Sequence, residues 1–265
     1  MKPFIIDFHW LGYAIRVPSY GAMMVLGYLL GYFETLRRAI REKEDPRSIE
    51  DLFLIVIASV TLGSRLFHVV FEDPVYYFQH PAKIFAVWEG GYTFYGGLLL
   101  GMLGIYFYCR IRGVNFLRLI DIITPAAIFG SVLGRVGCFL AGCCWGKPTA
   151  MPWGVVFHDP LAMVPDHVHA LHPTQLYEAA GLLVLSIYLW FLCNRRKFDG
   201  QVFFSALIGY AVIRFVIEFW RGDDYRGFIL GGALSYAQMV SLTLLPFTIV
   251  AMFLYSRLRK SANSL

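Results

Sequence analysis

Residues 201–221 read QVFFSALIGYAVIRFVIEFWR. A helix needs about 20 mainly apolar residues to cross a bilayer, and this run is long enough to do so. It nevertheless carries Arg214 and Glu218 inside the apolar stretch. A charge at the centre of a bilayer costs about 2.5–3.5 kcal/mol on insertion scales, and such residues usually face a bundle interior or a water-filled cavity. The stretch therefore predicts a membrane-spanning helix with a polar, functional face.

The composition of the whole chain agrees with this interpretation. Of its 265 residues, 58% are hydrophobic and 15% are charged, whereas soluble domains usually carry about 25% charged residues. The net charge is +5, and on a soluble protein such an excess would suggest nucleic acid. Here the basic residues lie at the ends of apolar runs, so membrane topology explains them and no nucleic-acid partner is expected.

Long apolar runs elsewhere predict an all-α, polytopic membrane helix bundle with about seven transmembrane helices. The chain then forms one integral membrane domain over residues 1–265, with longer outer segments at about 72–92 and 141–174. The predicted spans lie at about 18–36, 52–71, 93–110, 119–140, 175–193, 201–220 and 236–256.

The basic residues predict the orientation of these spans. The linkers after the first, third and fifth spans and the C-terminal tail carry about fourteen Lys and Arg residues, against about six on the other side. The positive-inside rule then places the C-terminus in the cytoplasm and the N-terminus outside. Residues 1–16 do not resemble a cleavable signal peptide, because they lack a basic stretch followed by a short apolar region.

Four polar side chains of the sixth span share one helix face. Tyr210, Arg214, Glu218 and Arg221 follow one another at spacings of four, four and three residues, which matches about 3.6 residues per helical turn. Glu218 can pair with either arginine. One interpretation is a buried ion pair that only fixes helix packing, and the other is a functional site near the outer leaflet.

Further candidates lie in Gly134-Arg135-Val136-Gly137-Cys138-Phe139, at the end of the fourth span. A guanidinium fork suits phosphate because it donates two parallel hydrogen bonds, and a phospholipid headgroup is the phosphate found at this depth. The alternative for Arg135 is an arginine that snorkels to the interface. Arg65 is a further charge inside a span, and Glu178 lies near the end of another.

The remaining candidates have structural alternatives of equal or greater weight. Tyr95-Gly96-Gly97-Leu98 offers a phenol with room for substrate, or a close helix contact. Tyr20 fits a site or an interface belt, and His172 fits a catalytic group or a helix cap. Cys138, Cys143 and Cys144 lack the C-x-x-C spacing of zinc or thioredoxin-like sites, so small-residue packing is the favoured interpretation and no metal is predicted.

Together these segments resemble the prolipoprotein diacylglyceryl transferases of the bacterial inner membrane, over nearly the whole chain. The resemblance implies transfer of a diacylglyceryl group from phosphatidylglycerol to the lipobox cysteine of an exported prolipoprotein, the first step of lipoprotein maturation. It implies the bilayer and the prolipoprotein signal peptide as partners and no cofactor. The matching pieces are Tyr20-Gly21, Tyr95-Gly96-Gly97-Leu98, Gly134 through Gly146, His172 through Glu178, and Tyr210 with Arg214, Phe215, Glu218 and Arg221.

The chain departs from the family pattern at two places. The family commonly has His-Gly-Gly-Leu where this chain has Tyr95, and its arginine signature commonly carries two asparagines and a glutamate where this chain has Cys138, Ala141 and Cys143. A histidine base at position 95 and a carboxylate at position 143 are therefore unavailable. A divergent member with another acceptor stays open as an alternative.

The resemblance and the residues lead to one mechanistic hypothesis. A thiolate displaces a phosphate ester at the glycerol carbon, while Arg135 and Arg214 hold the phosphate and stabilise its charge. Glu218 and Arg221 orient Arg214 or gate entry, and Tyr95 binds the headgroup or relays a proton. The sequence does not name the base that makes the thiolate. The predicted catalytic residues are Arg135, Arg214, Tyr95 and Glu218, and the predicted substrate-binding residues are Arg135, Tyr20, Gly96, Gly97, Cys138, Cys143, Gly146, Tyr210, Arg221 and His172.

Two rival functions follow from the same residues. Buried arginines also line anion pathways, so a transporter or channel is one alternative. The pseudo-symmetric half-repeats typical of many transporters are not found in the sequence. A membrane thiol oxidoreductase using the three neighbouring cysteines is the other.

Overall fold

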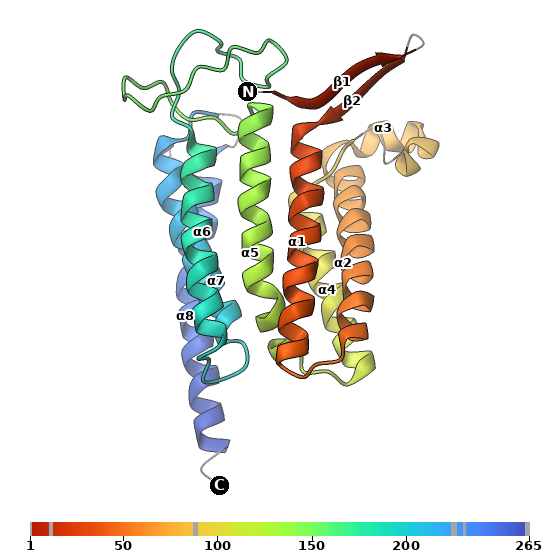
Figure 1. The fold of residues 1–265 in the computed structure, drawn as a ribbon, viewed down its shortest axis with the longest axis vertical. Coiled ribbons are helices and arrows are strands. Elements are labelled where there is room, and N and C mark those ends of the chain that lie inside the picture. The colour runs from red at the N-terminus through yellow and green to blue at the C-terminus, as the bar shows by residue number, and fades with distance from the viewer. Residues whose placement is uncertain (1, 11–12, 87–89, 224–226, 230–231, 263–265) are drawn as a thin grey trace. The chain divides into compact units, whose positions relative to one another are not determined.

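The computed structural model describes residues 2–10, 13–86, 90–223, 227–229 and 232–262, which are mainly helical (Figure 1). The long helices are α1 (Ser19–Arg41), α2 (Pro46–Phe67), α4 (Phe94–Arg112), α5 (Phe116–Ala141), α6 (Thr174–Cys193), α7 (Gln201–Ile217) and α8 (Tyr236–Ala262). The shorter elements are a π-helix (His68–Glu72), α3 (Pro74–Gln79), 3-10 helices at Pro81–Phe85 and Glu218–Trp220, and strands β1 (Phe4–Trp10), β2 (Tyr13–Pro18), β3 (Phe228–Ile229) and β4 (Leu234–Ser235).

The helices confirm the predicted membrane character. Five segments are long and apolar enough to cross a bilayer, at 46–72, 116–141, 174–193, 201–220 and 236–258. Helices α1 and α4 occupy the other two predicted positions but are not among these five. A multi-pass helical protein is therefore established, and the total of seven spans stays a prediction.

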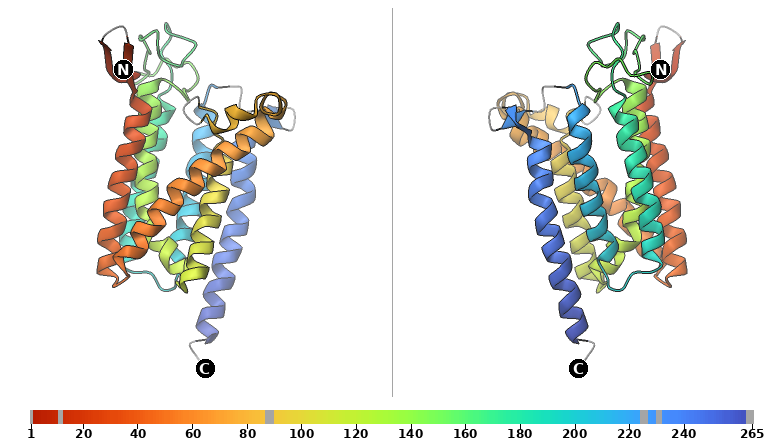
Figure 2. Two further views of the ribbon diagram at one scale, coloured as in Figure 1. Left: turned by 90° about the vertical axis from the view of Figure 1, so that its right-hand side faces the viewer. Right: turned by 90° about the vertical axis from the view of Figure 1, so that its left-hand side faces the viewer.

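The chain divides into two compact units, one formed by residues 1–34 and 120–265 and the other by residues 35–119. In the first unit the hairpin of β1 and β2 and the segment after α5 lie at one end of the helices, and the last turns of α8 lie at the opposite end (Figures 1 and 2). A core of Val132, Ala179 and Leu182, with Tyr210 packed against it, joins α5, α6 and α7. The prediction of one undivided domain remains a prediction.

A carboxylate on α5, that of Asp121, caps the N-terminus of α7. The first backbone N–H groups of a helix have no partner within it, and the residue at the cap of α7 is Gly200, which has no side chain to supply one. Asp121 accepts from the Gly200 and Phe203 amides at 2.8 and 2.9 Å. The backbone carbonyl of Asp121 has no helical donor four residues later, because Pro125 has no backbone N–H. The Cys193 thiol on α6 donates to this carbonyl instead, at 3.7 Å. These contacts join three helices of the first unit.

The second unit is built around close contact between α2 and α4. A Cβ added to Gly63 would overlap the carbonyl oxygen of Gly96, and one added to Gly97 would overlap the hydroxyl of Ser64. Glycine is needed at these positions because the two backbones approach so closely. Close helix packing therefore accounts for Gly96 and Gly97. Their predicted contact with substrate stays a prediction.

Arg65 has a structural role in the same unit. Its guanidinium donates to the carbonyls of Ile84 at 3.0 Å and Gly91 at 3.2 Å, and also to those of Lys83 and Gly90. It also lies 5.1 Å from the ring centroid of Tyr77. Because backbone oxygens occupy its donors, this arginine holds the segment after α3 rather than a ligand.

Candidate active site

Two arginines from different helices share one buried carboxylate in the first unit. Arg135 Nη2 on α5 lies 3.0 Å from Glu178 Oε1 on α6, and Arg214 Nη1 on α7 lies 3.8 Å from Glu178 Oε2. The Glu178 side chain is only 1% exposed, whereas Arg135 and Arg214 retain 22% and 14%. The carboxylate thus fixes the two guanidiniums from the buried side and leaves part of each accessible.

Arg214 has a second acidic partner, Glu218, one turn later in the chain. Its Nη2 lies 3.1 Å from Glu218 Oε2, the predicted pairing of residues four apart. Its Nη1 is buried and faces Glu178 Oε2 at 3.8 Å, which is too long for a hydrogen bond. The buried side of Arg214 therefore faces carboxylates, and an anionic ligand could reach only the 14% of this side chain that stays exposed.

Arg221 is held rigidly beyond the end of α7. Its Nε donates to Asp223 Oδ1 at 3.0 Å, and its Nη2 donates to Asp223 Oδ2, which makes a bidentate pair. Three arginines and three carboxylates therefore meet in this unit, and their formal charges cancel. The guanidiniums are positioned rather than free, so phosphate binding here would rely on their unoccupied N–H groups instead of excess charge.

Gly146 connects the outer segment to Arg221. Its amide donates to the His172 carbonyl at 3.0 Å, Lys147 donates to the Trp220 carbonyl at 2.8 Å, and Gly146 forms an isolated bridge with Arg221. A Cβ at Gly146 would lie 2.5 Å from the His172 carbonyl oxygen and 2.8 Å from that of Trp220. Only glycine fits between these backbones, which explains its place in the predicted site.

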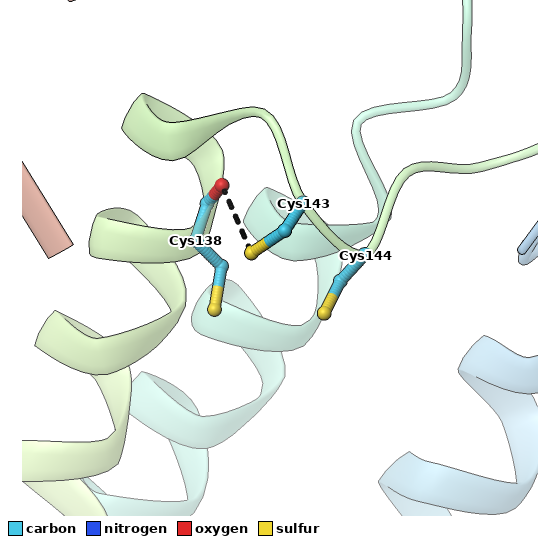
Figure 3. A group of neighbouring side chains, drawn as sticks. All are labelled: Cys138, Cys143 and Cys144. Atoms are coloured by element: carbon cyan, nitrogen blue, oxygen red, sulfur yellow. Dashed lines mark hydrogen bonds between the residues drawn. The ribbon is translucent and has the colours of Figure 1, made fainter. Parts of the chain in front are cut away.

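Three thiols lie together where α5 ends. Gly142, at φ +75°, turns the chain back, and the Cys143 amide donates to the Cys138 carbonyl at 3.1 Å. The sulfur atoms of Cys138, Cys143 and Cys144 all lie within 4.8 Å of one another (Figure 3). Hydrogen bonds with the other two sulfurs lower the pKa of the Cys144 thiol, and Arg221 and Arg135 lower it further.

The start of α6 holds the cysteine segment and His172. Gln175 Nε2 donates to the Cys143 carbonyl at 2.6 Å, and Thr174 Oγ1 donates to the Cys144 carbonyl at 2.9 Å. His172 Nδ1 lies 3.0 Å from the Tyr177 hydroxyl, which accepts a bond from an indole. Both alternatives for His172 therefore remain, since its backbone pairs with Gly146 and its ring has a polar partner.

Two predicted tyrosines of this unit lie near the cluster. Tyr20 begins α1 and packs beside Gly137, whose added Cβ would lie 3.2 Å from the Tyr20 Cα. Tyr210 lies on α7, one turn before Arg214, and packs against the core shared by α5 and α6. Tyr95 belongs to the other unit, in the first turn of α4, and is 61% exposed. Its predicted catalytic role stays a prediction.

Comparison with known proteins identifies the family. Residues 8–254 match the family described as prolipoprotein diacylglyceryl transferase. The chain belongs to the prolipoprotein diacylglyceryl transferase family. It is 37% identical over 249 residues to the phosphatidylglycerol–prolipoprotein diacylglyceryl transferase of Bordetella avium, covering 92% of each chain. The relatives of the same name from Nitratidesulfovibrio vulgaris and Geobacter sulfurreducens are 36% and 35% identical, over 92% and 95% of this chain and 90% and 92% of theirs.

Around the arginines of this diacylglyceryl transferase family member lie three residues that were not predicted as site residues from the sequence. Glu178 was noted only as a charge near a helix end, and Asp223 and Gln175 were not considered as site residues. An acidic residue at the start of an apolar helix was the available signal for Glu178. The pairing of Asp223 with Arg221 has no such signal, since it depends on the turn that follows α7.

Proposed function

We propose that this chain transfers the diacylglyceryl group of phosphatidylglycerol to the lipobox cysteine thiol of exported prolipoproteins. The observation that carries the proposal is the sharing of Glu178 by Arg135 and Arg214, in a chain whose relatives carry the name of this reaction. The family gives no support to an anion channel or a thiol oxidoreductase.

In the proposed reaction, the phosphate of the lipid binds the outward N–H groups of Arg135 and Arg214. The 22% and 14% of their side-chain surface that Arg135 and Arg214 keep exposed beside the buried Glu178 support this placement. As the acceptor sulfur attacks the glycerol carbon, negative charge grows on the leaving phosphate oxygen, where fixed guanidinium donors stabilise it most. Glu178 and Glu218 act as positioning residues because each contacts an arginine rather than the substrate.

Further predicted contacts belong to the same proposal. Tyr20, Tyr210 and Arg221 would surround the headgroup in the first unit, with Gly146 and His172 at its outer side. The predicted location is the bacterial inner membrane, with seven spans, the N-terminus outside and the C-terminus in the cytoplasm, so that the site meets exported signal peptides.

The arginine role is tested by transfer of labelled diacylglycerol from phosphatidylglycerol vesicles to a lipobox peptide. Arg135→Lys and Arg214→Lys keep the charge but lose the planar fork, and we expect each to lower kcat/KM by roughly 100-fold or more, as removal of one stabilising donor does. The matched control is Arg118→Lys, because Arg118 pairs with Glu44 at 2.7 Å in the second unit. Its activity should stay near that of the parent chain.

Two results would contradict the proposal. Wild-type rates in both lysine variants would show that the forks do not hold the phosphate. Flux of anions through proteoliposomes, together with no lipid transfer by the parent chain, would replace the transferase by a channel. A serine acceptor peptide supplies the substrate control, since it removes only the thiol.

A further inference from the structure

The three thiols at the end of α5 form a ready set of metal ligands. Their sulfur atoms lie within 4.8 Å of one another, and no histidine or carboxylate of the described residues joins the group. Three sulfurs bound to one tetrahedral Zn²⁺, at about 2.3 Å each, would be about 3.8 Å apart. A small contraction of Cys138, Cys143 and Cys144 would therefore enclose a thiophilic ion.

The backbone around these thiols is fixed by contacts that do not involve sulfur. Thr174 and Gln175 hold the carbonyls of Cys144 and Cys143 at 2.9 and 2.6 Å. Cys144 has φ +60°, a left-handed conformation that is unfavourable for residues other than glycine. Such conformations cost about 1–3 kcal/mol and persist where the surroundings hold them, often at functional sites.

The contacts of the described residues near the arginines identify no base for the acceptor thiol. We propose that Cys138, Cys143 and Cys144 bind Zn²⁺ as three thiolates and that its fourth position binds the acceptor cysteine as a thiolate. The inference rests on the proposed transferase function. Three protein ligands and one open position are typical of catalytic zinc, and a thiol bound to such an ion is deprotonated.

The reaction balances without an oxidant or a further reactant. Binding of the acceptor releases its thiol proton to water. A sulfur electron pair then forms the C–S bond at the glycerol carbon while the C–O bond to phosphate breaks, and the electrons of that bond leave on the phosphate oxygen. The neutral thioether is a weaker ligand than a thiolate, so it dissociates, and the ion remains Zn²⁺.

The location of the thiols suits this step. Cys138 follows Arg135 by three residues on α5, so the two side chains lie on the same helix face. Arg135 and Arg221 both act electrostatically on Cys144. The phosphate bound by the arginines and the sulfur bound by zinc would therefore be neighbours, and the guanidiniums would offset the charge of the thiolates.

Metal content of the purified full-length protein is the first test. We expect about one zinc ion per chain, and a loss of zinc affinity of more than about tenfold in Cys138→Ser, Cys143→Ser and Cys144→Ser, since losing even an outer partner of a metal ligand costs that much. Cys193→Ser is the matched control, because Cys193 is buried in the same unit beside Asp121. Zinc retention by the three serine variants, or a disulfide between two of the thiols, would overturn the site.

The open position is tested on the wild-type chain, without any variant. Cobalt is loaded in place of zinc, and the sulfur-to-cobalt charge-transfer band is recorded before and after adding a lipobox peptide. The band should intensify with the cysteine peptide and stay unchanged with the serine peptide. An unchanged band with both peptides would overturn binding of the acceptor by the metal.

Transfer activity separates this inference from the proposed function. Removal of the metal with a chelator should abolish transfer, and Zn²⁺ should restore it. Full transfer by the metal-free protein would reject the inference and leave the transferase function intact. A zinc-loaded protein that binds the cysteine peptide but transfers no lipid would support the metal site and reject the proposed function.

Discussion

Glu178 holds two cationic side chains from helices on either side of its own. Its carboxylate is almost completely buried, at 3.0 Å from Arg135 and 3.8 Å from Arg214. Removing one partner of a buried ion pair leaves an uncompensated charge, which costs about 3–5 kcal/mol. Here two arginines would lose the same counter-charge.

Glu178→Gln should therefore lower the free energy of unfolding by about 3–5 kcal/mol, measured by thermal unfolding in detergent. Its control is Glu44→Gln, which removes the partner of Arg118 from a more exposed pair and should cost about 0–1 kcal/mol. Equal unfolding temperatures for the two variants would show that Glu178 does not hold the arginines together.

At this scale the sequence indicated which side chains are unusual but not what they contact. Arg65 and Arg135 both interrupt apolar runs. Arg65 donates to backbone carbonyls of a later segment, whereas Arg135 pairs with a carboxylate on another helix. The difference arises from chain turns distant in sequence, so the charge pattern within a span could not separate a structural arginine from a candidate site residue.

Helices α2 and α4 depend on glycines at their contact. We expect Gly63→Ala to destabilise the protein by about 1–3 kcal/mol, because its Cβ would overlap the Gly96 carbonyl and force the helices apart. Gly21→Ala on α1 is the control, since nothing lies within 4 Å of its added Cβ and alanine favours a helix by about 1 kcal/mol. Thermal unfolding of the two variants measures the difference, and similar losses in both would contradict the predicted contact.

Helix positions were largely predictable from the sequence, because apolar runs determine them. The predicted limits of α6 differ from the structure by one residue, whereas α8 begins where predicted and continues six residues past its predicted end. Helix α1 continues past its apolar part to Arg41. The predicted span ended earlier because hydropathy detects the apolar part of a helix and not its end. The β1–β2 hairpin was not predicted, because it lies outside the runs that the hydropathy argument used.

The two ends of the first unit should face opposite sides of the membrane. Met163 lies in the segment after α5 and is exposed, and Asn194 lies in the turn between α6 and α7. In intact spheroplasts, a membrane-impermeant thiol reagent should label Met163→Cys above the background of the parent chain and should label Asn194→Cys only after permeabilisation. The reverse pattern would invert the proposed orientation.

The division of the whole molecule into two units had no counterpart in the sequence argument. Charged linkers separate successive apolar runs throughout the chain, so none of them marks a boundary between units. The sequence places the three cysteines near one another, but their spacing alone does not show that the three sulfurs converge. The left-handed turn at Gly142 brings them together.

The capping of α7 by Asp121 has a consequence for biosynthesis. Ribosomal synthesis delivers α5 well before α7, and the leading amides of α7 find their acceptor on that earlier helix. Until the later helix docks, those amides have no protein acceptor from Asp121, and in lipid every such group is costly. Docking of α7 beside α5 therefore completes the cap of α7, and the order of synthesis makes α5 the helix that is already present when α7 arrives.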